Sequence, residues 1–259
     1  MLLASDVGNS NIALGLFRGD RLEASFRLHT NLKATTDEYS LLLDGLLRHA
    51  GYQPTDITGA ALASVVPPLT NVFVSALTGL AGQPPLLIDA GVKTGVPIRY
   101  DPPRDVGADR VVNAVAVQHE YSVPACVIDF GTATTFDAVN ALGEYVGGAI
   151  APGLEISLEA LATRTAKLQK VELRRPPNVI GTNTPNAIQS GWVFGYVGLV
   201  EGMVARFRRE LGESMIVVGT GGLVGVVAKE TAVIDHVDTA LTLKGLRLVY
   251  ELNQERKRD

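Results

Sequence analysis

The chain has 259 residues, of which 46% are hydrophobic and 19% are charged, and its formal net charge is -4 at pH 7. This composition predicts a globular protein with room for two domains. The acidic balance excludes a basic nucleic-acid surface. The sequence contains no run of about 18 apolar residues, so no membrane span is predicted. The single cysteine, Cys126, excludes an intramolecular disulfide and favours a cytoplasmic location. Small molecules are therefore the expected ligands.

The first half of the chain predicts a strand meander followed by alternating helices and strands. Thr35 and Glu38 have the spacing of a capping box, and Gly51 is placed to end the helix that follows. The predicted strands cover residues 2–6, 12–17, 22–28, 60–66 and 86–89, and the predicted helices cover residues 36–50 and 69–80. A helix beginning near residue 108 is expected to join the two halves.

The second half repeats this order. The predicted strands cover residues 126–130, 134–141, 145–150 and 215–218, and the predicted helices cover residues 153–163, 196–211 and 241–252. Three meander strands followed by helices and strands in both halves indicate two domains of similar fold. We place them at residues 1–115 and 116–259.

An acidic residue ends the first strand of each half. Asp6 is followed by a turn of Gly8, Asn9, Ser10 and Asn11, and Asp129 is followed by Gly131 and Thr132. A carboxylate beside a small turn rich in hydrogen-bond donors suits a nucleotide phosphate held through a cation. The alternative is that each aspartate caps neighbouring backbone amides. Because the pattern occurs twice, it resembles the actin-like kinase and ATPase superfamily, in which two such turns grip ATP.

The segment 101–110 contains the other candidate for chemistry. Its prolines and glycine predict a loop, and Asp109 and Arg110 follow in the first turn of a helix. The helix dipole there is expected to lower the pKa of Asp109 and keep it ionised. An ionised aspartate can orient a substrate hydroxyl, and Arg104 or Arg110 can bind a substrate carboxylate. Asp109 could equally pair with one of these arginines in a purely structural role.

Six segments together resemble type III pantothenate kinase, in that family's order and over nearly the whole chain. They are Asp6-Val-Gly-Asn-Ser-Asn11, Ser64-Val-Val-Pro67, Asp105-Val-Gly-Ala-Asp-Arg110, Asp129-Phe-Gly-Thr-Ala-Thr-Thr135, Gly147-Gly-Ala-Ile-Ala-Pro-Gly153 and Leu241-Thr-Leu-Lys-Gly245. The blocks containing Asp109 and Asp129 are the most specific. Ser10 stands where threonine is commoner in the family, and the hydroxyl is kept.

The resemblance implies an ATP-dependent kinase that phosphorylates pantothenate in the first step of coenzyme A synthesis. Asp109 would be the general base. The residues implied to contact ATP and Mg²⁺ are Asp6, Val7, Gly8, Asn9, Ser10, Asn11, Ile12, Ala13 and Thr132. Those implied to contact pantothenate are Tyr100, Gly107, Ala108, Asp109, Arg110 and Thr184.

The resemblance further implies that Asp129 holds a monovalent cation, K⁺ or NH₄⁺, and that the protein is a homodimer in which Thr184 reaches the partner subunit's site. The expected architecture is α/β, with two duplicated actin-like, ribonuclease H-like domains flanking a nucleotide cleft. Two alternatives stay open: another actin-like small-molecule kinase, and a non-catalytic regulatory homologue.

Overall fold

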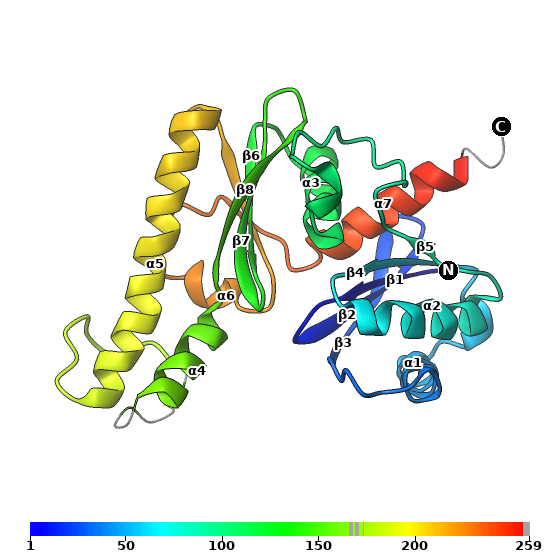
Figure 1. Ribbon diagram of the computed structural model, residues 1–259, viewed down its shortest axis with the longest axis horizontal. Coiled ribbons are helices and arrows are strands. Elements are labelled where there is room, and N and C mark those ends of the chain that lie inside the picture. The colour runs from blue at the N-terminus through cyan, green and yellow to red at the C-terminus, as the bar shows by residue number, and fades with distance from the viewer. Residues whose placement is uncertain (166–167, 169–170, 173, 256–259) are drawn as a thin grey trace. The chain divides into compact units, whose positions relative to one another are not determined.

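The computed structural model describes residues 1–165, 168, 171–172 and 174–255, which form two compact units (Figure 1). Unit 1 comprises Met1–Glu120 together with the C-terminal segment from Ala240, and unit 2 comprises Tyr121–Thr239. Each unit contains one five-stranded sheet. None of the helices among these described residues has the length and apolar character needed to cross a membrane.

The sheet of unit 1 has the order β3-β2-β1-β4-β5. Its first three strands are antiparallel neighbours, whereas β1, β4 and β5 run parallel. The strands are β1 Leu2–Val7, β2 Asn11–Arg18, β3 Arg21–His29, β4 Gly59–Ser64 and β5 Leu86–Leu87. The helices are α1 Thr36–His49, α2 Pro67–Ala81, α3 Ala108–Glu120 and α7 Leu241–Glu255, with short 3-10 turns at Pro54–Asp56 and Pro103–Asp105.

Helix α1 forms where the capping box predicts it. The Thr35 hydroxyl accepts from the Glu38 amide at 3.4 Å, and the Glu38 carboxylate accepts from the Thr35 amide at 2.7 Å. Gly51 follows the helix with φ of +87°, which a residue with a Cβ adopts only at a cost. The predicted start and end of this helix are therefore confirmed.

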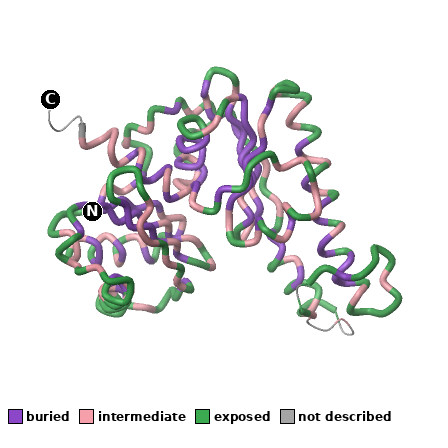
Figure 2. Tube along the Cα trace, turned by 180° about the vertical axis from the view of Figure 1, so that it is seen from behind, coloured by how far each residue is buried: buried purple, intermediate pink, exposed green. Residues whose placement is uncertain are grey.

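Helices α1 and α2 cover one face of the first sheet and form its core. Val7 and Ile12 at the strand ends pack in this core with Tyr39 of α1 and Phe73 of α2, whose rings lie 4.6 Å apart. The buried stretches appear as purple segments of the tube in Figure 2. Because successive side chains of a strand face opposite sides, Asp6 lies on the other face of the sheet from Val7.

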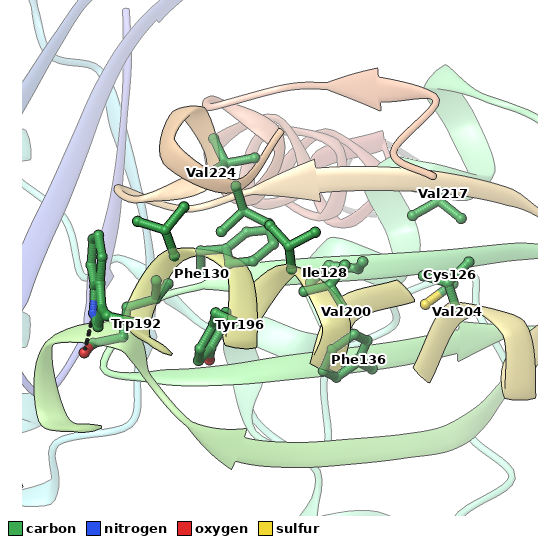
Figure 3. Close-up of a cluster of buried hydrophobic side chains, with 14 of the residues drawn as sticks. Cys126, Ile128, Phe130, Phe136, Trp192, Tyr196, Val200, Val204, Val217 and Val224 are labelled. Carbon is green, nitrogen blue, oxygen red and sulfur yellow. Dashed lines mark hydrogen bonds between the residues drawn. The ribbon is translucent and has the colours of Figure 1, made fainter. Parts of the chain in front are cut away.

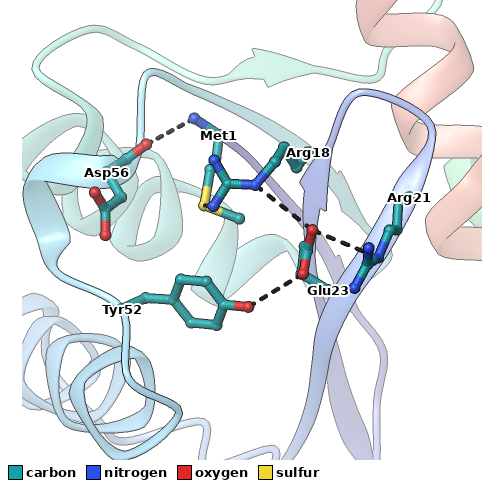
Figure 4. Close-up of polar contacts among 6 residues, drawn as sticks. All are labelled: Met1, Arg18, Arg21, Glu23, Tyr52 and Asp56. Atoms are coloured by element: carbon teal, nitrogen blue, oxygen red, sulfur yellow. Dashed lines mark hydrogen bonds and ion pairs between the residues drawn. The ribbon is translucent and has the colours of Figure 1, made fainter.

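A polar cluster contacts the start of β1, which is the end of the strand farther from Asp6 (Figure 4). The amino group of Met1 donates to the carbonyl oxygen of Asp56 at 2.6 Å. Glu23 pairs with Arg18 at 3.5 Å and with Arg21 at 3.6 Å. Since the arginines are exposed, each pair contributes about 1 kcal/mol or less, so the core sets the position of β1.

Helix α7 belongs to unit 1 because its buried face packs there on α3. Thr242 donates to the Asn113 side chain at 2.8 Å, and Arg247 pairs with Glu120 at 3.6 Å and with Glu251 at 2.7 Å. The units therefore differ in two places from the sequence-based division at residues 115/116. Unit 1 continues to Glu120, and the chain returns to it from Ala240.

The sheet of unit 2 has the order β10-β9-β6-β7-β8. Its meander strands β6, β7 and β8 are antiparallel, and β6, β9 and β10 are parallel. The strands are β6 Ala125–Phe130, β7 Ala133–Val139, β8 Tyr145–Pro152, β9 Ile216–Thr220 and β10 His236–Val237. The helices are α4 Leu154–Arg164, α5 Thr184–Leu211 and α6 Val224–Val227. Three meander strands followed by two parallel strands recur in both units, as the duplicated α/β fold predicts.

Helix α5 supplies the largest share of the second core of any single element (Figure 3). Trp192 and Tyr196 share its buried face and pack with Ile128 and Phe136 of the sheet. The Trp192 indole donates to the Leu154 carbonyl oxygen at 2.9 Å. Burial raises the pKa of the Cys126 thiol, as expected of a packed, inert cysteine.

The predicted start of this helix at residue 196 is wrong, because α5 begins at Thr184. Asn183 caps it by accepting from the Asn186 amide at 2.9 Å, and Pro185 stands in its first turn, where no amide is needed. Exposed glycines inside the helix obscure its apolar periodicity. The short strand β10 was also not predicted.

Candidate active site

The first acidic turn joins β1 to β2 in unit 1. Asp6 is the penultimate residue of β1, and the Gly8 amide donates to the Asn11 carbonyl oxygen at 3.1 Å across the turn. A Cβ on Gly8 would lie 2.9 Å from that oxygen, so the turn requires glycine. Val7 and Ile12 are fully buried, so their side chains lie in the core and cannot contact a ligand.

The second acidic turn joins β6 to β7 in unit 2. Asp129 lies opposite Thr135 of β7 and Thr220 of β9 in the strand register. The Gly131 amide donates to the Ala133 carbonyl oxygen at 3.0 Å. Gly221, with φ of +91°, brings its backbone against the Asp129 carboxylate, where a Cβ would collide with Oδ1.

Each of the two turns also accepts a backbone hydrogen bond at an equivalent position. The Thr30 amide, just after β3, donates to the Ser10 carbonyl oxygen at 3.0 Å, and the Gly153 amide, just after β8, donates to the Thr132 carbonyl oxygen at 3.2 Å. In both units the residue after the third meander strand therefore supports the acidic turn. Neither role is predicted from the sequence, because Thr30 lies two residues beyond the predicted strand 22–28 and Gly153 is the first residue of the predicted helix 153–163.

Asp109 is held in the first turn of α3. Its Oδ1 accepts from the Arg110 amide at 2.8 Å, and a Cβ on Gly107 would lie 2.5 Å from the same oxygen. Burial raises the pKa of Asp109 above its ordinary value, while the Arg110 amide and charge act in the opposite direction. The expectation of a lowered pKa is wrong, because desolvation outweighs the favourable effects of the helix start.

Asp6 and Asp109 belong to the same edge of the first sheet. The Val65 amide, which follows β4, donates to the Val7 carbonyl oxygen at 3.1 Å. The Cβ position of Gly107 lies 3.5 Å from Cγ1 of Val65. The segment carrying Asp109 therefore packs beside the carboxyl ends of β1 and β4, where ligands bind in open α/β sheets.

The other predicted substrate contacts differ in exposure. Tyr100 is 38% exposed and Arg104 is exposed in the same loop, whereas Arg110 is buried. Gly107 and Ala108 are intermediate and form the entry to α3. Unit 1 thus holds every predicted contact except Asp129, Thr132 and Thr184, which belong to unit 2.

The acidic turns fit cations that bind through few protein ligands. Among the described residues, no group of three or more His, Cys, Asp or Glu side chains could hold a metal ion. Mg²⁺ on a nucleotide usually takes one or two carboxylates together with phosphate oxygens and water, which a turn with a single aspartate allows. Asp129, with threonines opposite it in the register, offers the oxygen ligands that hard cations prefer.

Two sheets of identical strand order, each with an acidic turn after its first strand, define the actin-like class of kinases and ATPases. Solved structures agree. The activator of 2-hydroxyisocaproyl-CoA dehydratase from Clostridium difficile, with bound ADPNP, matches with a TM-score of 0.54 at 12% identity, covering 100% of this chain and 97% of that one. The inorganic polyphosphate/ATP-glucomannokinase from Arthrobacter matches with a TM-score of 0.52 at 15% identity, covering 98% of each. At these identities the likeness shows the fold.

Sequence comparison identifies the family. Residues 2–206 match the family described as type III pantothenate kinase. Type III pantothenate kinase from Moorella thermoacetica is 53% identical over 98% of this chain and 100% of its own length, and the protein of that name from Geobacter sulfurreducens is 50% identical with the same coverage. The chain belongs to the type III pantothenate kinase family.

Proposed function

We propose that this protein transfers the γ-phosphate of ATP to pantothenate, forming 4'-phosphopantothenate and ADP in the first step of coenzyme A synthesis. The observation that carries the proposal is the identity of about half of all residues, over the full chain, to proteins named type III pantothenate kinase. The position of Asp6 and Asp109 at one sheet edge supports it, because phosphoryl transfer depends on positioning and charge more than on covalent chemistry.

ATP is bound by the turn of residues 6–13 and by Thr132 of the second turn. The backbone amides of Asn9, Ser10 and Asn11 are suited to the phosphates, and Asp6 is suited to the metal. Gly8 lets the turn form, and its own amide donates to the Asn11 carbonyl oxygen. Val7, Ile12 and Ala13 contribute through their main chain and through the shape that they give to the turn. Mg²⁺, when bound, would neutralise charge on the β and γ phosphates.

Asp109 acts as the general base. Its carboxylate accepts the proton of the pantothenate hydroxyl while that oxygen bonds to the γ-phosphorus and the bond to the β-phosphate oxygen breaks. The raised pKa supports this role, because it brings the base closer to neutral pH. Tyr100, Gly107, Ala108 and Arg110 hold pantothenate, and the Arg110 guanidinium is suited to its carboxylate.

Asp129 holds a monovalent cation, K⁺ or NH₄⁺. The Asp129 carboxylate lies against the Gly221 backbone, and Thr135 and Thr220 are its neighbours in the strand register, so carboxylate and hydroxyl groups are available in this part of unit 2. This set of ligands supports a monovalent cation, which needs several oxygen ligands and only one carboxylate.

The protein functions as a homodimer. Gly191, Gly195 and Gly198 are exposed on α5, nothing in the described chain lies within 4 Å of their Cβ positions, and they recur three or four residues apart. Glycine in a helix costs about 1 kcal/mol relative to alanine, yet no contact within the described chain requires it here. A flat glycine face suits close approach by α5 of a second copy.

Thr184 falls on the same helical face, since it precedes exposed Ala187 by three residues and Gly191 follows that alanine by four. This placement supports the proposal that Thr184 serves the partner subunit's site. Because ATP and coenzyme A precursors are cytoplasmic metabolites, we place the protein in the cytoplasm.

A coupled assay for ADP release tests this function. Pantothenate should stimulate ADP release in the presence of Mg²⁺ and K⁺, whereas sugars and short acyl acids should not. Stimulation by one of those compounds in place of pantothenate would favour another actin-like kinase. No stimulated release by any substrate, from protein that binds ATP, would favour a regulatory homologue.

A further inference from the structure

Thr30 makes two hydrogen bonds to the first acidic turn. It directly follows β3 and is 7% exposed. Its amide donates to the Ser10 carbonyl oxygen at 3.0 Å, and its hydroxyl donates to the Gly8 carbonyl oxygen at 2.7 Å. One residue outside the turn therefore fixes two of the turn's carbonyl groups.

These two bonds determine the direction of two amide groups. In a planar trans peptide, the carbonyl of one residue and the N–H of the next point in opposite directions. Because the Gly8 and Ser10 carbonyls point to Thr30, the N–H groups of Asn9 and Asn11 point away from it. Amides that share a direction in a turn form an anion-binding concavity.

The second turn shows that the hydroxyl is not needed for the backbone scaffold. Gly153 makes the equivalent backbone bond to Thr132 without a side chain. A Cβ there would lie 2.6 Å from the Gly131 carbonyl oxygen, so this turn leaves no room for one. The first turn is one residue longer, from Gly8 to Asn11 against Gly131 to Ala133, and the Thr30 hydroxyl reaches the Gly8 carbonyl there.

Thr30 is itself held by the core. The Tyr39 hydroxyl accepts from the Asn31 amide at 3.0 Å and donates to the Asn31 carbonyl oxygen at 3.2 Å. Tyr39 is 1% exposed and packs on Phe73. The core of unit 1 therefore fixes the backbone immediately after Thr30, which leaves the Thr30 hydroxyl little freedom.

We propose that Thr30 is a positioning residue for the terminal phosphates of ATP, acting through the amides of Asn9 and Asn11. This inference rests on the proposed function of the turn. Thr30 touches no reacting atom. The Thr30 hydroxyl fixes the conformation of the turn, so that the amides of Asn9 and Asn11 meet the β and γ phosphates without rearrangement.

Thr30→Val and Thr30→Ser in the full-length protein test the proposal. Valine keeps the shape and the backbone bond but loses the hydroxyl, so the KM for ATP should rise about tenfold. The KM for pantothenate and the inhibition constant of AMP, which lacks the β and γ phosphates, should change less than about twofold. Serine should restore the KM for ATP.

Thr78→Val is the matched control, because it deletes a hydroxyl that donates to the Val74 carbonyl oxygen within α2. It should leave the KM for ATP unchanged. An unchanged KM for ATP in Thr30→Val would overturn the proposal, as would equal weakening of AMP and ATP or failure of serine to restore binding. If the wild-type protein shows no pantothenate-dependent ATP consumption, the proposed function fails instead, and direct ATP binding to the two variants still tests the role of Thr30.

Discussion

Gly153→Ala should displace the second acidic turn, which carries the predicted ATP contact Thr132, although residue 153 is not itself a predicted ligand contact. A Cβ at residue 153 would lie 2.6 Å from the Gly131 carbonyl oxygen and closer still to that of Thr132. Carbon–oxygen contacts are about 3.3 Å or longer, so the turn must retreat by at least about 0.7 Å. Displacements near 1 Å cost on the order of 100-fold in rate, and overpacking costs about 1–3 kcal/mol of stability.

The assay is steady-state kinetics with ATP varied at saturating pantothenate and K⁺, together with thermal unfolding. We expect kcat/KM for ATP to fall by 10- to 100-fold, on the order given by misplacement of reacting groups. Gly45→Ala is the control, because nothing lies within 4 Å of its Cβ position in α1. A Gly153→Ala protein with wild-type kinetics and melting temperature would refute the role given to the Gly153–Thr132 contact.

Four further predictions concern the other parts of the site. Asp109→Asn should lower kcat by about 100-fold or more and leave ATP affinity nearly unchanged; near-normal turnover would remove Asp109 from the mechanism. Because burial raises the pKa of Asp109, the activity of the wild-type protein should be lost as the pH falls through a value above the ordinary aspartate range. The Asp109→Asn variant no longer carries a desolvated charge, so its melting temperature at neutral pH should be no lower than that of the wild type. Asp129→Ala should weaken activation in a potassium titration, and an unchanged titration would reassign the cation site. Gly195→Leu should yield monomers in sedimentation and raise the KM for pantothenate, whereas a dimeric variant would exclude the glycine face as the interface.

Local sequence patterns were sufficient to predict the meanders and the acidic turns. Asp6 and Asp129 each end an apolar run before a glycine turn, and this pattern depends only on neighbouring residues. The capping box at Thr35 is equally local. The repeated order of strands then follows, because each half carries the same sequence of local signals.

Features that depend on contacts distant in sequence could not be predicted. Helix α7 packs in unit 1 through contacts of Thr242 with Asn113 and of Arg247 with Glu120, each of which joins residues more than a hundred positions apart in the chain. Desolvation of Asp109 requires the surrounding packing, so the helix start alone gave the wrong direction for its pKa. The role of Thr30 depends on the spatial proximity of β3 to the first turn.

The most direct test of the account is identification of the reaction product. Wild-type protein, ATP, Mg²⁺, K⁺ and pantothenate should yield equal amounts of ADP and 4'-phosphopantothenate by mass spectrometry, and Asp109→Asn should yield little of either. Release of ADP without a phosphorylated pantothenate, or full product formation by Asp109→Asn, would contradict phosphoryl transfer to a hydroxyl deprotonated by Asp109.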